Sequence, residues 1–116
     1  MSELAIMLDR EKAEATVRYI VSFLASSDYD ALALFSVGDG LSADELRHAI
    51  KSYGSKVVAE PFDASKPEPL DDGSGWWTDV DLYAVEGGLS DLTLSLTIFD
   101  TEKPLYDVRI DDLHVL

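Results

Sequence analysis

The stretch DLTLSLTIFD (residues 91–100) has the most regular pattern in the sequence and predicts a β-strand. Its apolar residues occupy every second position: Leu92, Leu94, Leu96 and Ile98. Polar residues lie between them: Asp91, Thr93, Ser95 and Thr97. Because successive side chains of a strand point to opposite faces, this alternation predicts an antiparallel sheet with one face on the core and the other toward solvent.

The segments on either side predict further strands. In GWWTDVDLYAV (75–85) the even positions from Trp76 to Ala84 are mostly apolar, which places Trp77 on the opposite, outer face. KVVAEPF (56–62) reads as a short strand stopped by Pro61. The next residues, 61–75, contain three of the four prolines, so we expect a long loop there.

The last strand, LYDVRIDDLHVL (105–116), changes its alternation part-way. Val108 and Ile110 occupy even-numbered positions, whereas Leu113 and Val115 occupy odd-numbered positions. Residues on one face differ in parity only when an extra residue lies between them, so we predict a bulge at Asp111 and Asp112. The alternative is a strand that ends there and crosses a different part of the core.

The first half of the chain has helical periodicity. Residues 8–27 place apolar side chains at intervals of three and four and have Asp9 as a candidate cap. Residues 29–36 predict a second helix, with Ser27 or Asp28 as its cap, although a strand is also compatible. In residues 40–55 the Ser42 and Glu45 pair forms a capping box, and Gly54 ends a third helix.

Helices followed by a strand meander predict an α+β fold, with the helices on one face of a curved antiparallel sheet of about four strands. Cystatin and NTF2-like folds have this order of elements. The length fits a single domain over residues 1–116, with a helical half (1–55) and a sheet half (56–116) that bury each other's apolar faces.

The chain is strongly acidic, with 23 carboxylate residues against 9 lysines and arginines and a net charge of −14. Residues 1–59 hold 9 acids and 6 bases, net −3, and residues 60–116 hold 14 acids and 3 bases, net −11. Such a charge repels phosphate backbones and anionic membranes, so we expect no direct nucleic-acid or membrane binding. It favours a basic partner. The sequence has no cysteine, no basic leader and no long apolar run, which predicts a cytoplasmic protein.

The outward positions of the last three strands predict an acidic surface with an aromatic anchor, open to a basic protein. Arg109 is the basic residue among them. The two acids of the long loop, Asp71 and Asp72, extend the predicted partner-binding set. That set is Asp71, Asp72, Trp77, Asp79, Asp81, Tyr83, Asp91, Asp107 and Asp111.

The same acids could also bind a metal ion or take part in catalysis, and each of these roles has a structural alternative. Asp79 and Asp81, with the acids beside His114, offer oxygen and nitrogen ligands for a divalent cation, but aspartates on a solvated strand face are more common. Asp112 and His114 are two positions apart and so lie on one face of a strand, where Asp112 could orient His114 as a base. No nucleophile motif accompanies the pair. His48 adjoins the core stripe of its helix. We therefore expect no catalytic residue, metal or cofactor.

Residues 75–100 (GWWTDVDLYAVEGGLSDLTLSLTIFD) and 110–116 (IDDLHVL) resemble small acidic bacterial immunity proteins of contact-dependent growth inhibition and related polymorphic toxin systems. The resemblance covers about residues 75–116 and implies cytoplasmic neutralisation of a toxin domain, often a basic nuclease, by a carboxylate-rich surface. No family catalytic residues carry over. Two alternatives remain open: a cone-shaped ligand-binding protein or enzyme with a pocket near Asp112 and His114, lined by Trp76 and Tyr106, and an adaptor without inhibitory function. The oligomeric state stays open.

Overall fold

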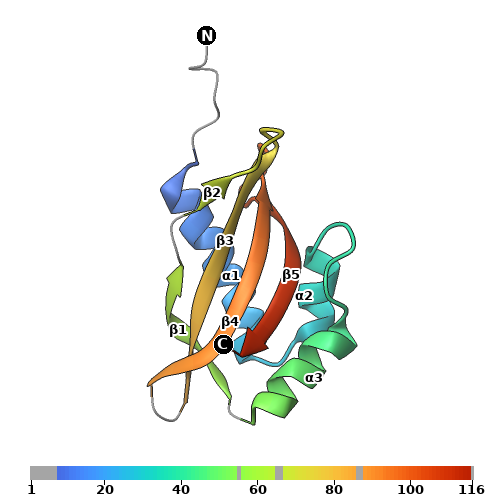
Figure 1. Cartoon of the computed structure of the whole chain (residues 1–116), viewed down its shortest axis with the longest axis vertical. Helices are drawn as coiled ribbons and strands as arrows, with labels where there is room; N and C mark the ends of the chain where they lie inside the picture. The colour runs from blue at the N-terminus through green and yellow to red at the C-terminus, as the bar shows by residue number, and fades with distance from the viewer. Residues whose placement is uncertain (1–7, 55, 65–66, 86–87, 116) are drawn as a thin grey trace.

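The computed structural model describes residues 8–54, 56–64, 67–85 and 88–115, and it excludes the side chains of residues 88, 89 and 91. Three helices are followed by an antiparallel sheet of five strands, so the predicted α+β fold is confirmed (Figure 1). The elements are α1 Arg10–Ala25, α2 Tyr29–Phe35, α3 Ala43–Tyr53, β1 Val57–Ala64, β2 Glu68–Pro69, β3 Gly75–Ala84, β4 Gly88–Phe99 and β5 Asp107–Val115. Among the described residues, no helix has the length and apolarity needed to span a membrane.

The helix boundaries follow the predicted caps. Asp9 accepts a hydrogen bond from the N–H of Lys12 at 3.1 Å and begins α1. Asp28 accepts from Ala31 at 3.2 Å and begins α2, so Tyr29–Phe35 is a helix and not a strand. Ser42 and Glu45 form both bonds of the predicted capping box of α3. Gly54 ends α3 with φ +86°, in the left-handed region that favours glycine.

The strand order is β1-β3-β4-β5, and β2 pairs with β3 along the same edge as β1. The predicted count of about four strands was one short, because β2 lies within the segment expected to be a loop. The expected stop at Pro61 was also wrong, since β1 continues to Ala64. Proline is tolerated there because β1 is an edge strand with a register shift between Val57 and Phe62.

The predicted bulge in β5 is confirmed. Ser95 pairs with Asp112 and the next residue, Leu96, pairs with Ile110, so Asp111 is the extra residue. The insertion reverses the facing of the strand and points Leu113 into the core, where it is 6% exposed. Val115, also expected in the core, is 54% exposed, and it pairs with Leu92 in the last described pair of the β4–β5 ladder.

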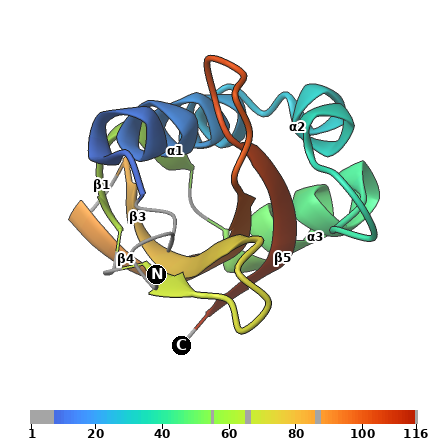
Figure 2. The same cartoon turned by 90° about the horizontal axis from the view of Figure 1, so that it is seen from above.

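A single cluster of buried side chains joins the helices to the inner face of the sheet. From α1 it contains Val17, Ile20, Val21 and Leu24, and from the sheet it contains the inward residues of β3, β4 and β5. Figure 2 shows α1 on one side of the curved sheet and α2 and α3 beyond β5. The opposite, outer face of β3, β4 and β5 is turned toward the viewer in Figure 1, and no helix covers it.

The connection between α2 and α3 runs along the edge of β5. The N–H of Val37 donates to the carbonyl of Val108 at 2.7 Å, and the N–H of Leu41 donates to that of Ile110 at 2.9 Å. Gly40 permits this approach, because a Cβ atom there would lie 2.9 Å from the Ile110 carbonyl oxygen. The edge of β5 is therefore paired over Val108 and Ile110.

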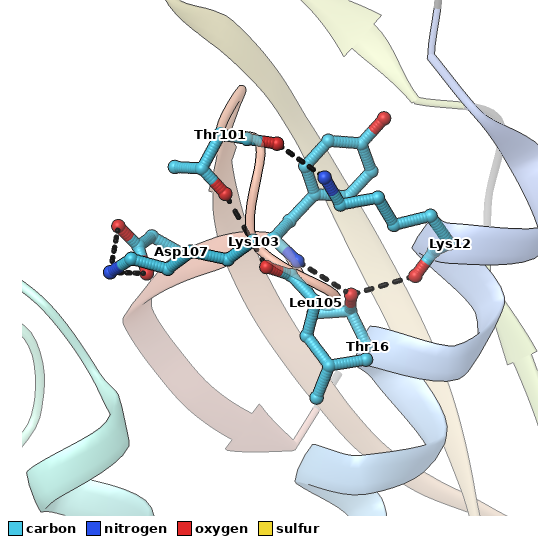
Figure 3. Close-up of polar contacts among 7 residues, drawn as sticks. Lys12, Thr16, Thr101, Lys103, Leu105 and Asp107 are labelled. Atoms are coloured by element: carbon cyan, nitrogen blue, oxygen red, sulfur yellow. Dashed lines mark hydrogen bonds and ion pairs between the residues drawn. The ribbon is translucent and has the colours of Figure 1, made fainter.

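Polar contacts hold the first turns of α1 against the chain between β4 and β5 (Figure 3). Lys12 Nζ donates to the carbonyl of Thr101 and lies 4.4 Å from the centre of the Tyr106 ring. Thr16 Oγ1 accepts from the N–H of Tyr106 at 3.0 Å and donates to the carbonyl of Lys12 at 2.7 Å. Since Thr16 is fully buried, these bonds satisfy polar groups that would otherwise lack partners.

Candidate functional site

The outer face of the sheet carries the predicted acidic surface. On β3 the inward and outward positions alternate as expected, so Trp76 is 6% exposed in the core and Trp77 is 46% exposed on the outer face. Asp79, Asp81 and Tyr83 continue the outward row. The alternation of polar and apolar residues therefore predicted correctly which face of the sheet these residues occupy.

A row of hydroxyl groups on β4 holds the carboxylates of both neighbouring strands. Thr93 donates to Asp81 at 3.4 Å, Ser95 to Asp79 at 2.7 Å and Thr97 to Asp111 at 2.5 Å. Thr93 and Thr97 are 3% exposed although they point away from the core, because the side chains on the adjacent strands cover them. We expected these positions to face solvent, and pairing across the strands explains the difference. The bonds restrict the rotamers of the carboxylates.

The β1 and β2 edge adds two carboxylates that sequence reasoning missed. Asp63 pairs with Asp81 and Glu68 pairs with Trp77, so both side chains lie on the outer face. Tyr83 Oη donates to Asp63 Oδ2 at 2.8 Å, and this hydrogen bond to a carboxylate raises the pKa of Tyr83. The alternation of Phe62, Asp63 and Ala64 could have indicated that Asp63 faces outward on a strand. The nearby prolines favoured a loop instead.

The bulge of β5 contributes the other side of the surface. Asp111 accepts from Arg109 Nε at 2.6 Å as well as from Thr97, and Arg109 also donates to Thr97 at 3.1 Å. Two successive acidic side chains, those of Asp111 and Asp112, are exposed at this point. An ordinary strand would direct alternate residues to opposite faces, so the bulge increases the density of carboxylates on the outer face.

His114 lies on the same face as Asp112, as the parity predicted. Its Nδ1 atom is 3.0 Å from Asp112 Oδ2, a contact that has the distance of an ion pair without the geometry of a hydrogen bond. In the register of the sheet His114 is opposite Thr93. Among the described residues no three His, Asp or Glu side chains are grouped closely enough to hold a metal ion.

Of the remaining predicted residues, Asp71, Asp72 and Asp107 take no part in the hydrogen bonds of the hydroxyl row. Asp71 and Asp72 are in the turn between β2 and β3, where Asp72 accepts from the hydroxyl and the N–H of Ser74 at 2.7 and 2.9 Å. These bonds lower the pKa of Asp72, the hydroxyl contributing most. Asp107, at the start of β5, is 3.2 Å from Lys103 Nζ. Asp91 belongs to β4, but its side chain is outside the described part of the structure.

A cavity of about 640 Å³ lies on the other side of the sheet, between α1 and the inner face. The ligand-binding alternative placed a pocket near Asp112 and His114, lined by Trp76 and Tyr106. Trp76 lines this cavity, and the ring of Tyr106 packs against that of Trp76 with ring centres 5.7 Å apart. Asp112 and His114 lie on the outer face of the sheet, so this cavity is not the pocket of that alternative.

Comparison with known proteins gives a family assignment. Residues 21–116 match the family described as Domain of unknown function (DUF7668). The chain belongs to the DUF7668 family. The family match includes every residue of the outer face described above and begins within α1. No curated protein and no solved structure matches the chain, so a likeness to cystatin or NTF2-like folds stays a prediction.

The outer face of this DUF7668 chain therefore gathers carboxylates, most of which accept hydrogen bonds from neighbouring residues. We call it the acidic face. It consists of Asp63, Glu68, Asp79, Asp81, Asp111 and Asp112, with Trp77 at its margin. Arg109 is the arginine that lies among these six carboxylates in the described part of the chain.

Proposed function

We propose that this protein is an immunity protein that binds and neutralises a basic toxin domain, a nuclease, through the acidic face. The observation that carries the proposal is the group of six carboxylates on one face of the sheet, three of which are held by the hydroxyl row of β4. Their mutual repulsion lowers the free energy of unfolding, and a partner that brings positive charge relieves it. Such an arrangement suits recognition more than it suits stability.

The chemistry of a nuclease makes it a suitable partner. Its substrate-binding surface carries lysines and arginines that contact phosphates, and the acidic face offers carboxylates in place of those phosphates. Charge complementarity of this kind raises the association rate. Trp77, half-exposed beside the carboxylates, supplies an aromatic anchor of the type that contributes most of the binding energy at interfaces.

The proposal includes the location and the extent of the interface. Neutralisation takes place in the cytoplasm, where such a nuclease meets its substrate. The turn that contains Asp71 and Asp72 extends beyond one end of the sheet and adds two exposed carboxylates at the margin of the interface.

The test begins with the gene beside that for this chain: we expect it to encode a toxic C-terminal domain, and the readout is survival of cells that express that domain. The double substitution Asp79→Lys and Asp81→Lys should abolish protection and lower the association rate with the purified toxin by about tenfold or more at low salt. The matched control is Glu11→Lys with Asp30→Lys, which changes the net charge equally on the exposed surfaces of α1 and α2. Circular dichroism confirms that both variants fold.

Equal protection by the two double variants would exclude the acidic face as the interface. A neighbouring gene that encodes no toxic domain would contradict the immunity function itself. In that case the acidic face is tested against the basic proteins that the purified chain retains in a column experiment, with the same pair of variants as a comparison.

A further inference from the structure

The cavity between α1 and the sheet has the size and lining of a ligand-binding pocket. Its volume, about 640 Å³, lies within the usual range for small-molecule sites, about 300–1,000 Å³. Nine of the twelve described residues that line it are apolar. Val17 of α1 forms one wall, Trp76 and Ile98 of the sheet form the floor, and Phe62 forms a further side.

The charged residues of the cavity are on one side, along α1. Arg10 and Glu14 are one helical turn apart and exposed, so they lie at the opening. Glu14 Oε1 is 3.6 Å from Arg18, which also contacts Glu60 at 3.2 Å. Arg10 forms no ion pair with any described residue.

This lack of a partner distinguishes Arg10 from the other arginines. Arg18, Arg47 and Arg109 each have a carboxylate within 3.6 Å or less. A guanidinium group that pairs with no carboxylate among the described residues, beside an apolar chamber, is complementary to a ligand with an anionic head and an apolar body.

We propose that the cavity binds a single-chain carboxylic acid, with its carboxylate on Arg10 and its hydrocarbon tail over Trp76 and Ile98. A methylene group takes about as much space as a water molecule in the liquid, about 30 Å³, so a chain of about ten carbons needs about 300 Å³ and fits within the cavity. This function is separate from the proposed function, because the cavity and the acidic face are on opposite sides of the sheet.

The two tryptophans provide a direct test, since they are adjacent in the sequence and lie on opposite faces. In Trp77→Phe the remaining tryptophan, Trp76, lines the cavity. A bromine-terminated undecanoate should quench its fluorescence in a saturable way, because bromine quenches tryptophan only at close range. In Trp76→Phe the remaining Trp77 should show no saturable quenching over the same concentrations.

The position of the head group is tested with Arg10→Gln. This variant should weaken the binding of undecanoate by about tenfold or more and leave the binding of undecanol unchanged. The control is Arg47→Gln, which removes an exposed arginine from α3. Affinity for wild-type protein should rise by about fourfold for each methylene added between octanoate and undecanoate.

Two results would overturn the proposal. One is equal quenching of Trp76 and Trp77, or none at either, which would mean that the acid does not enter the cavity. The other is an equal loss of undecanoate and undecanol binding in Arg10→Gln, which would mean that Arg10 does not hold the carboxylate. Either result leaves the test of the immunity function unaffected, because that test uses residues of the acidic face.

Discussion

Tyr83 and Asp63 show how one hydrogen bond sets a protonation equilibrium at the margin of the acidic face. The neutral phenol donates to the carboxylate, whereas the phenolate would be repelled by it, so the folded protein holds the pKa of Tyr83 above its ordinary value of about 10. The contribution of this pair to stability is full below the unfolded pKa. It is lost as the pH rises through the folded pKa.

We predict that Asp63→Asn lowers the pKa of Tyr83 toward its ordinary value. The asparagine keeps the shape of the side chain and removes the negative charge that disfavours the phenolate. The measurement is a pH titration of the Tyr83 Cζ chemical shift by NMR. Asp30→Asn, on α2, is the control and should leave the Tyr83 titration unchanged. A Tyr83 pKa that is the same in Asp63→Asn and wild type would refute the assigned cause.

The bulge of β5 determines which side chains its last residues bury. Because Asp111 is the extra residue, its deletion would restore plain alternation and keep Leu113 facing the core and His114 facing outward. The change would remove one carboxylate from the outer face, together with the hydrogen bonds that it accepts from Thr97 and Arg109. Partly exposed contacts of this kind typically contribute about 1 kcal/mol or less.

We therefore predict that the variant without Asp111 folds and keeps Leu113 buried, with a urea midpoint only slightly below that of wild type, by circular dichroism and urea denaturation. The control, Asp111→Asn, keeps the bulge and should fold with a similar urea midpoint. A deletion variant that is unfolded while Asp111→Asn is folded would show that the bulge itself is required for the packing of β5.

Much of this architecture could be predicted because side-chain periodicity acts locally. The capping box at Ser42, the alternation of β4 and the parity change at Asp111 each follow from a few adjacent residues. The short strand β2 and the outward position of Asp63 did not follow, because proline-rich edge segments pair through contacts that only the folded sheet supplies. The hydroxyl row depends on cross-strand neighbours for the same reason, and the cavity depends on how α1 packs on the sheet.

Charge repulsion acts on the molecule as a whole, since the net charge is −14 and six carboxylates are close together on one face. At an ionic strength of about 0.01 M the Debye length, about 30 Å, exceeds the distances across the acidic face, and at about 0.15 M it is about 8 Å. We predict that added NaCl raises the melting temperature, by about 4 °C for each 1 kcal/mol of repulsion that is screened.

Calorimetry of the wild type between these two ionic strengths measures this effect. The double variant Asp81→Asn with Asp112→Asn removes two charges from the acidic face and should show a smaller rise over the same range. Equal salt dependence in the two proteins would mean that the repulsion arises elsewhere in the chain.

The edges of the sheet have a further consequence for the protein at the concentrations found in cells. A free strand edge is a template on which other chains aggregate, because its unpaired N–H and C=O groups accept a new strand. Here the α2–α3 connection occupies the edge of β5 at Val108 and Ile110, and Asp112 binds the N–H of Leu113 just beyond. The opposite edge contains Pro61 and Pro69, which lack the N–H that a new strand requires. In its described parts the sheet therefore presents a broad face to a partner while its edges resist growth into β-aggregates.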